Sequence, residues 1–311
     1  MVNIAVAGGN GAIGQTMVEM LKNSPRHHTF IVSRKQDSGD QDVPIITVDY
    51  NDIPSVTEKL EENNIHTVIC AFHVTPTALS ISQLNLIKAS AASNATKRFI
   101  PTSFAIDYPR DFVKYLPPLK DYFACLDMLK RTDLEWTEIH NGIFLDYFAM
   151  SRGLKSNLAP NVIAVDIEHN KAALPGDGNM PVAFTYSYDM ARFVIASLDL
   201  PKWPTVSRIV GDKVTWNEFV ALAEEVTQKK FDIQYDDVNR LSNGQITELP
   251  SHVRLYGTYN GKEYLCRFLA DFELMDAVGA SDIRMEDSLN KKFPHIRPLT
   301  IRSMLERYWG K

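Results

Sequence analysis

The fold is decided by residues 2–14, which read Val2-Asn3-Ile4-Ala5-Val6-Ala7-Gly8-Gly9-Asn10-Gly11-Ala12-Ile13-Gly14. The apolar run predicts a buried strand, and apolar positions at helical spacing from Ile13 onward predict a helix. At the junction of strand and helix, Gly8, Gly11 and Gly14 give the spacing G-x-x-G-x-x-G. We expect the first to permit a tight turn, the second to let backbone N–H groups approach a phosphate, and the third to let the helix lie close to the strand. The stretch therefore predicts a dinucleotide-binding turn.

Short apolar segments alternate with helical patterns through the first half of the chain. The sequence predicts strands at 29–33, 45–48, 67–72 and 98–101, and helices at 54–63 and 77–93. This alternation is typical of βαβ units and a parallel sheet. From about residue 150 the elements become shorter and richer in Pro, Gly and Asn. We therefore predict an α/β fold, with a Rossmann-type doubly wound parallel sheet over 1–150. A smaller α+β part over 151–311 should mainly bind substrate and return some segments to the sheet.

Composition excludes several classes of protein. The chain has 311 residues, 45% of them hydrophobic and 23% charged, which are values typical of globular proteins. Its net charge of -5 is spread without long basic blocks, so we expect neither nucleic acid nor a membrane surface as a partner. A small-molecule substrate and a monomer or homodimer are expected instead. A strand that begins at residue 2 leaves no room for a signal or transit peptide, which favours the cytoplasm.

The cysteines and one polar cluster predict neither a disulfide nor a metal site. Cys70, Cys125 and Cys266 lie far apart in apolar surroundings, as buried free thiols of a reducing compartment do. Asp166, Glu168 and His169 have ligand chemistry, but adjacent polar residues at a strand end are more often a solvated loop. We therefore expect no metal.

The end of the second strand indicates which dinucleotide binds. In dinucleotide-binding folds an acidic residue at this position binds the 2′-hydroxyl of NAD, whereas an arginine accommodates the 2′-phosphate of NADP. This strand ends in Arg34-Lys35, with no acidic residue beside it. The guanidinium group favours NADP(H), the alternative being a cation exposed on a solvated loop.

The loop after strand 67–72 lies at the carboxyl end of that strand, which is the ligand side of a parallel sheet. We expect Phe72 and His73 to contact the cofactor there. Proton transfer by His73 is one alternative, and a purely structural loop histidine is the other.

Residues 97–107, Lys97-Arg98-Phe99-Ile100-Pro101-Thr102-Ser103-Phe104-Ala105-Ile106-Asp107, resemble the strand-5 signature of the NmrA-like and isoflavone reductase-like proteins. These form an atypical branch of the short-chain dehydrogenase superfamily. Other matching segments are the glycine motif, 136–147, Pro175-Gly176-Asp177-Gly178, Phe184-Thr185 with Asp189, 209–212 and 298–300. The match covers nearly the whole chain in the right order. It is similar above all to fungal NmrA-like oxidoreductases, often associated with secondary metabolism.

The resemblance implies a catalytic lysine, and Lys120 stands at the family position, at the start of the helix before strand 6. An ammonium group there holds the nicotinamide ribose and assists proton transfer. The ordinary Y-x-x-x-K pattern is absent, because residue 116 is leucine and Tyr115 is off by one. An ordinary surface lysine is the alternative.

The glycine motif and the resemblance together predict a set of cofactor-binding residues. They are Gly8, Asn10, Gly11, Ala12, Ile13, Gly14, Arg34, Lys35, Asp49, Phe72, His73, Ser103, Phe104, Lys120, Asn141 and Phe144. Where reductases of this branch often have Ser-Glu-Phe-Gly after strand 5, this chain has Thr102-Ser103-Phe104-Ala105. The lost carboxylate leaves hydroxyl groups as partners for substrate, with Tyr108 and Tyr147 as the predicted substrate-binding residues and Thr102 and Ser103 as further candidates.

These observations predict an NADPH-dependent reductase that transfers hydride to a carbonyl or electron-poor double bond of a small aromatic or polyketide-type metabolite. Two alternatives stay open: a non-catalytic NAD(P)-sensing regulator of the NmrA type, and a tailoring isomerase or dehydratase on the same fold. The aromatic-rich segment 241–275 is either a lid or ordinary core.

Overall fold

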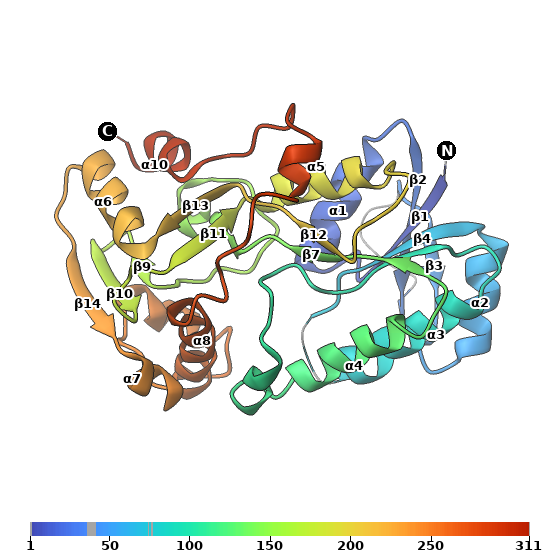
Figure 1. The fold of residues 1–311 in the computed structure, drawn as a ribbon, viewed down its shortest axis with the longest axis horizontal. Helices are drawn as coiled ribbons and strands as arrows, with labels where there is room; N and C mark the ends of the chain where they lie inside the picture. Colours follow the sequence, from blue (N-terminus) through green and yellow to red (C-terminus); the bar gives the residue numbers. More distant parts are fainter. Residues whose placement is uncertain (1, 36–41, 74, 76, 311) are drawn as a thin grey trace. The chain divides into compact units, whose positions relative to one another are not determined.

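The computed structural model in Figure 1 describes residues 2–35, 42–73, 75 and 77–310. The chain forms two compact units. Unit 1 comprises Met1–Phe104, Arg110–His140 and Ala191–Ser207. Unit 2 comprises Ala105–Pro109, Asn141–Met190 and Arg208–Lys311. Both units are therefore assembled from segments that are distant in the sequence.

A six-stranded parallel sheet forms the centre of unit 1, in the order β3-β2-β1-β4-β5-β6. Its strands are β1 (Val2–Ala7), β2 (His27–Ser33), β3 (Ile45–Thr47), β4 (Ile65–Cys70), β5 (Arg98–Ile100) and β6 (Glu135–Trp136). This is the order of a Rossmann fold, whose ligand crevice lies where the order reverses, at the carboxyl ends of β1 and β4. The predicted α/β class and parallel sheet are confirmed.

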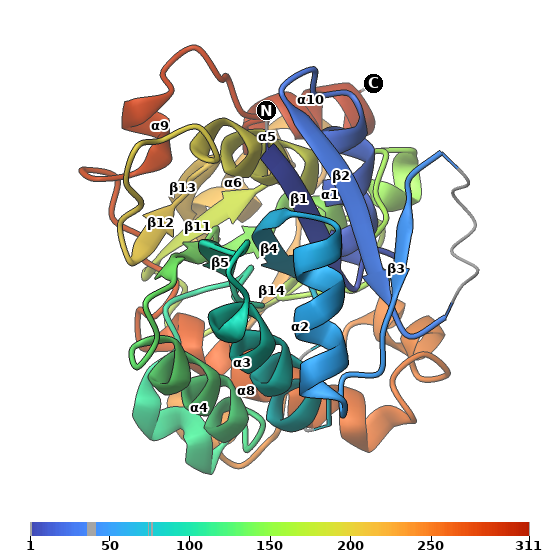
Figure 2. The same ribbon diagram turned by 90° about the vertical axis from the view of Figure 1, so that its right-hand side faces the viewer.

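Helices cover both faces of this sheet, which explains why its strands read as continuous apolar runs. Figure 2 shows α2 (Ile53–Glu62), α3 (Leu84–Ala92) and α4 (Leu119–Leu129) side by side on one face. The opposite face carries α1 (Ala12–Lys22), whose Met17, Val18 and Leu21 are buried. Unit 1 also contains the short helix η2 (Arg110–Lys114) and most of α5 (Ser187–Ser197).

One irregularity escaped the sequence pattern. The helix predicted over 77–93 begins as a π-helix, η1 (Ala78–Gln83), before it continues as α3. Buried Gln83 at the end of η1 accepts a hydrogen bond from the backbone N–H of Thr102 at 2.7 Å. The wider turn is invisible in the apolar periodicity, and π-turns occur frequently at functional sites.

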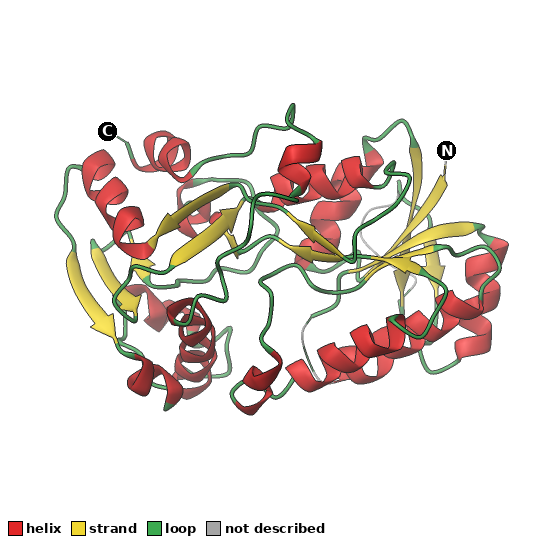
Figure 3. Ribbon diagram, in the orientation of Figure 1, coloured by secondary structure: helices red, strands yellow, loops and turns green. Residues whose placement is uncertain are grey.

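Unit 2 is built on two three-stranded sheets, β13-β11-β8 and β14-β10-β9 (Figure 3). Their strands are β8 (Ile143–Phe144), β9 (Val165–Asp166), β10 (Lys171–Pro175), β11 (Pro181–Thr185), β13 (Asp212–Thr215) and β14 (Asp232–Asp236). A short pair, β7 (Glu138–His140) with β12 (Val206–Arg208), completes the strands described. The core of unit 2 contains aromatic rings that meet tilted or edge to face, those of Phe148, Phe184, Trp216 and Phe219.

The helices of unit 2 are α6 (Trp216–Thr227), α7 (Val238–Ser242), α8 (Lys262–Ala277), α9 (Leu289–Lys292) and α10 (Ile301–Trp309). Three short 3-10 helices accompany them: η3 (Leu145–Phe148), η4 (Met150–Arg152) and η5 (Pro250–Leu255). The segment 241–275 is thus largely helical. None of the helices in the described part of the chain has the length and apolar composition that a bilayer crossing requires.

The three cysteines are free thiols, but only two of them are buried. Cys70 and Cys125 lie in the core of unit 1, where burial raises their thiol pKa values to about 12 and about 11. Cys266 was expected to be buried and is instead half-buried on α8. The apolar neighbours of Cys266 in the sequence alternate with charged residues, so part of this face of α8 is exposed.

Buried carboxyl groups gather where α8 packs against β10 and β14. Glu273 and Asp276 of α8 and Asp236 of β14 are all nearly inaccessible to solvent. Asp236 accepts hydrogen bonds from Thr247, whereas Oε2 of Glu273 has no partner among the described residues. Burial, reinforced by the charges of Asp236 and Asp276, raises the pKa of Glu273 well above its ordinary value. Burial likewise raises the pKa of Asp276 to about 7.

The raised pKa values of Glu273 and Asp276 make stability depend on pH. Unfolded Asp and Glu side chains lose their proton near pH 4, so between about pH 4 and 7 the unfolded state binds fewer protons than the folded state. The free energy of unfolding should therefore fall as pH rises through this interval. Glu273→Gln removes one proton from this linkage and should raise the free energy of unfolding at pH 8 by about 1–3 kcal/mol, with little effect at pH 4. Urea unfolding at both pH values measures this.

The matched control is Glu263→Gln, an exposed residue of the same helix, which should stay within about 0.5 kcal/mol of the parent at either pH. A Glu273→Gln protein less stable than the parent at pH 8 would contradict the assignment of a protonated, unpartnered carboxyl group.

Candidate cofactor site

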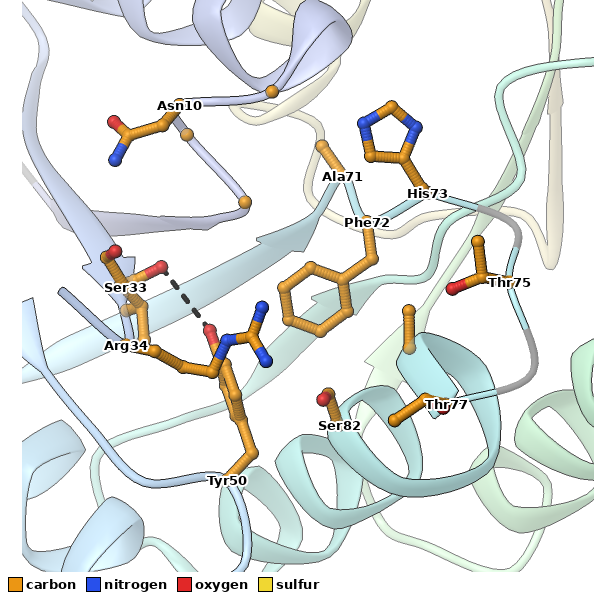
Figure 4. Close-up of a pocket in the computed structure, with 15 residues that line it drawn as sticks. Asn10, Ser33, Arg34, Tyr50, Ala71, Phe72, His73, Thr75, Thr77 and Ser82 are labelled. Carbon is orange, nitrogen blue, oxygen red and sulfur yellow. Dashed lines mark hydrogen bonds between the residues drawn. The ribbon is translucent and has the colours of Figure 1, made fainter. Parts of the chain in front are cut away.

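A cavity of about 390 Å³ lies at the carboxyl ends of β1, β2 and β4, where the strand order reverses (Figure 4). All of its walls belong to unit 1. They are the glycine turn 8–11, the strand end 32–34, Tyr50 after β3, and residues 71–73, 75, 77, 78 and 82 after β4. This edge of a doubly wound sheet is where such folds bind their ligands.

Each of the three motif positions is occupied by glycine for a different structural reason. Gly8 has φ of +79°, and a Cβ there would lie 2.7 Å from the carbonyl oxygen of Ala71. A Cβ on Gly14 would collide with the backbone of Gly8 and Gly9, so this glycine lets α1 pack on the turn. Gly11 differs: its backbone is extended, with φ of -86°, and the nearest atom beyond its chain neighbours to a Cβ there would be the carbonyl oxygen of Gly8, at 3.3 Å. The missing side chain of Gly11 therefore leaves room in the cavity.

The turn leads directly into α1, whose amino end faces the cavity. Gly11 is the N-cap, its N–H donates to the carbonyl of Gly8 at 2.8 Å, and Ala12 and Ile13 are the first helical residues. The first turn contains no acidic side chain. Free N–H groups and the positive end of the helix dipole make this position suited to a phosphate. Asn10 lines the same cavity.

Aromatic rings and one guanidinium group form the opposite end of the cavity. Figure 4 shows the side chain of Arg34 extending into the cavity, beside Tyr50 and toward Phe72. The rings of Tyr50 and Phe72 meet edge to face at 5.2 Å, and the Tyr50 hydroxyl donates to the carbonyl of Val32 at 3.3 Å. The rings of Tyr50 and Phe72 thus provide flat apolar surfaces next to the permanent positive charge of Arg34.

Two of the predicted cofactor residues lie near this end without lining the cavity. Lys35 is exposed, and its N–H donates to Oγ of Ser33 at 3.1 Å. Asp49 accepts hydrogen bonds from the backbone and side chain of Asn51, which hold its pKa below the ordinary value. The carboxylate of Asp49 therefore shapes the turn before α2.

The segment after β4 supplies polar groups that the sequence analysis did not single out. Thr75, Thr77 and Ser82 line the cavity together with His73. His73 is exposed, and its Nε2 lies 4.0 Å from the position that a Cβ of Gly11 would occupy. In the sequence, the position of these residues after a strand, at the carboxyl edge of the sheet, is the one feature that indicates contact with a ligand.

The hydroxyl groups after β5 already have partners. Thr102 accepts from the N–H of Phe72 at 2.9 Å and donates to the carbonyl of Cys70 at 3.0 Å. Ser103 accepts from the N–H of Ile139 at 2.9 Å and donates to the carbonyl of Pro101 at 3.1 Å. Both side chains and that of Phe104 are buried. They fix neighbouring strand ends, a contact between distant segments that sequence spacing does not reveal.

Lys120 is exposed in the first turn of α4, directly after buried Leu119. It does not line the cavity, but α4 packs against η1, which supplies Ala78 and Ser82 to the cavity wall. The helix starts with two backbone hydrogen bonds: the N–H of Lys120 donates to the carbonyl of Pro117, and the N–H of Asp121 donates to the carbonyl of Pro118. These bonds fix the backbone from which the Lys120 side chain extends.

The remaining predicted residues belong to unit 2. Asn141 is fully buried, with its N–H donating to Ala105 and its carbonyl accepting from the Thr185 hydroxyl at 2.7 Å. The ring of Phe144 meets that of Tyr147 at 6.3 Å. Tyr108 contacts Phe272 of α8 at 6.4 Å. Burial raises the pKa values of both tyrosines, so their hydroxyl groups stay neutral donors at physiological pH.

The polar cluster at 166–169 proves to be a structural network. Asp166 was expected in a solvated loop but is buried, because its carboxylate accepts from the N–H of Ser251 at 2.9 Å and pairs with His169 at 3.0 Å. Glu168 pairs with Arg254 at 2.8 Å. The cluster thus ties η5 to the strand β9.

Comparison with known proteins agrees with this architecture. The NmrA-like family model matches residues 2–284. The oxidoreductase BOA1 of Botryotinia fuckeliana (strain B05.10) is 35% identical over 234 residues, which cover 74% of this chain and 78% of the relative. The oxidoreductase swnN of Metarhizium robertsii (strain ARSEF 23 / ATCC MYA-3075) is 32% identical over 281 residues, covering 82% of each chain.

Solved structures share the fold at low sequence identity. Leucoanthocyanidin reductase from Vitis vinifera, in a binary complex with NADPH, superposes with a TM-score of 0.74 at 16% identity over 99% of both chains. NADPH-dependent quinone oxidoreductase QOR2 from Escherichia coli gives a TM-score of 0.71 at 16% identity over 98% of this chain and 99% of that one. The resemblance predicted from the strand-5 segment and the glycine motif is confirmed: the chain belongs to the NmrA-like family.

Proposed function

We propose that this protein is an NADPH-dependent reductase that transfers hydride to a carbonyl or electron-poor double bond of a small aromatic or polyketide-type metabolite. The observation that carries the proposal is the cavity of unit 1, which combines an anion-binding glycine turn with the guanidinium group of Arg34. The names of the relatives support it, since BOA1 and swnN are called oxidoreductases. Two structures with this fold are NADPH complexes of reductases.

The residues of the cavity fit NADP(H). The turn 8–11 and the start of α1 would hold the pyrophosphate, and Arg34 would pair with the 2′-phosphate in charge-assisted hydrogen bonds. The rings of Tyr50 and Phe72 would pack on the adenine. When bound there, the cofactor supplies the hydride, and the side chains of the cavity bind and orient it.

Arg34→Ala should weaken NADPH binding about tenfold or more while sparing NADH, because one charge-assisted contact contributes about 1.5–3 kcal/mol. Fluorescence titration with both cofactors measures the two dissociation constants. Arg131→Ala, which removes an exposed arginine elsewhere in unit 1, should change neither constant. Equal losses for NADPH and NADH in Arg34→Ala would exclude contact with the 2′-phosphate.

An aromatic cluster in unit 2 supports an aromatic substrate. Phe268 and Phe272 of α8 contact each other at 4.8 Å, and Tyr259 meets Phe268 at 5.6 Å. These three rings are half-buried, so each keeps a face that can stack on a ligand. Burial raises the pKa of Tyr147, and the phenols of Tyr259 and Tyr108 lie near enough for their charges to raise it further. We propose that unit 2 binds the substrate ring on these side chains and its oxygen atoms through the neutral phenols.

The experiment is NADPH oxidation against a panel of aromatic ketones, enones and quinones, with product analysis. We expect one reduced product molecule for each NADPH oxidised. In Phe272→Leu the KM for the substrate should rise while the KM for NADPH stays unchanged, and Tyr235→Leu, an exposed tyrosine of unit 2, is the control. NADPH binding without any turnover would favour a regulator instead. Product formed without NADPH loss would favour an isomerase or dehydratase.

A further inference from the structure

A second cavity, of about 580 Å³, lies at the opposite edge of the parallel sheet of unit 1. Its walls include the first residues of four strands: Val2 of β1, His27 of β2, Arg98 of β5 and Glu135 of β6. This is the edge at which Figure 1 marks the amino terminus, so the cavity is separated from the glycine turn by the length of the strands.

Part of the lining is a rigid framework. The Arg98 guanidinium donates to Glu135 at 2.6 Å and to the carbonyl groups of Leu198 and Leu200 at 2.8 Å each. It also stacks over the Trp203 ring at 4.7 Å. Arg98 and Glu135 are therefore occupied by each other and by the chain, and they hold the turn 198–200 in place.

One buried side chain of the cavity lacks partners. The side chain of His27 is only 3% exposed, and neither of its ring nitrogens has a hydrogen-bond partner among the described residues. Its Nε2 lies 3.6 Å from Oδ1 of Asp199, beyond hydrogen-bond distance, and Oδ2 of Asp199 pairs with Arg26 at 2.8 Å. An unpartnered buried polar group costs about 1–3 kcal/mol and requires an explanation.

Two further groups of the lining face the cavity with donor capacity. Lys97 is exposed and directly precedes β5, and its backbone N–H donates to the carbonyl of His66 of β4 at 2.9 Å. The two residues therefore lie side by side in the lining. Nδ1 of His66 lies 2.9 Å from the Thr67 hydroxyl, which leaves Nε2 for another partner. Burial and the charge of Arg98, opposed by Glu135, lower the pKa of His66. The imidazole of His66 is therefore neutral at physiological pH, with one ring nitrogen able to donate.

We propose that this cavity binds a phosphate group, either inorganic phosphate or the head of a phosphomonoester, through Lys97, His66 and His27. Both carboxylates of the lining, Glu135 and Asp199, are already paired with arginines. The remaining polar side chains of the lining can donate hydrogen bonds, so they match an anion with several acceptor oxygen atoms. Because these donors start from separate strands, a tetrahedral group matches them better than a planar carboxylate. The site is independent of the proposed reductase activity.

Histidine side-chain NMR tests the proposal at each cavity separately. The chain has eight histidines, and the imidazole signals of His27 and His66 are assigned by His27→Gln and His66→Gln. Inorganic phosphate, titrated at constant ionic strength, should shift these two signals saturably. His73, in the wall of the other cavity, reports binding at the glycine turn independently. Glycerol phosphate replaces inorganic phosphate in a parallel titration, and a lower dissociation constant identifies a phosphomonoester as the source.

Lys97→Gln should raise the phosphate dissociation constant about tenfold or more, since a hydrogen bond to a charged group contributes about 1.5–3 kcal/mol. The control Lys202→Gln removes an exposed lysine close to the same turn that does not line the cavity, and should leave the constant unchanged. Signals of His27 and His66 that do not move, or that move equally in the parent and in Lys97→Gln, would overturn the proposal.

Discussion

Gly11→Val should abolish measurable NADPH binding, by about 100-fold or more, in a protein that remains folded. The backbone at Gly11 is extended, which valine adopts readily, and a Cβ there would lie 3.3 Å from the carbonyl oxygen of Gly8, so the turn has to shift by only a few tenths of an ångström. The cost to the fold is the poorer N-cap, about 1 kcal/mol. The branched side chain would instead fill the space that a pyrophosphate needs, and two lost charge-assisted contacts of about 1.5–3 kcal/mol each exceed 100-fold.

Two variants show which glycine serves the ligand. Gly257→Val is the matched control, since a Cβ at Gly257 meets no atom within 4 Å, and it should bind NADPH like the parent. Gly14→Val should lose the fold itself, because its Cβ would collide with the backbone of Gly8. Circular dichroism and cofactor titration on all three separate these cases. Parent-like affinity in a folded Gly11→Val protein would place the phosphate site elsewhere.

Lys120→Ala should lower kcat by about 10²- to 10⁴-fold, the usual contribution of general acid–base help. Lys120 is exposed at the start of α4, and the chain has leucine at 116, where a tyrosine would share the proton transfer. The NADPH dissociation constant should change far less, because the glycine turn and Arg34 supply most of the binding. Steady-state kinetics together with cofactor titration separate the two effects.

The replacement of Lys120 by arginine tests what the ammonium group does. Arginine keeps the charge but does not release a proton at neutral pH, so Lys120→Arg should recover cofactor affinity without recovering kcat. Lys114→Ala, an exposed lysine of the preceding η2, serves as control. A Lys120→Ala enzyme that keeps more than half of the parent kcat would remove lysine from the mechanism.

Much of unit 1 was predictable because its signals are local. The strand at 2–7, the glycine spacing and the Arg34 strand end each depend on a few consecutive residues, and the structure brings the turn 8–11 and Arg34 to one cavity. Neighbouring strands of a parallel sheet end at the same edge, so order along the chain was enough to place Phe72 and His73 there as well.

The parts that escaped prediction depend on contacts between distant segments. Thr102 and Ser103 look like free hydroxyl groups in the sequence, yet their partners are Phe72 and Ile139. The sequence around Asp166 is typical of a solvated loop, but in the folded chain its carboxylate accepts a hydrogen bond from the N–H of Ser251, 85 residues away. The aromatic face of α8 cannot be told from core by periodicity, because half-burial of Phe268 and Phe272 is set by tertiary packing.

Hydride transfer from NADPH to a bound metabolite is the reaction on which the proposed function depends. The most direct measurement uses NADPH deuterated at the reactive carbon of the nicotinamide, incubated with the protein and a substrate from the aromatic panel, and follows the label by mass spectrometry. We expect one deuterium in the reduced product from only one of the two stereospecifically labelled cofactors. Reduced product without deuterium from either labelled cofactor, or conversion without any oxidised cofactor, would contradict it.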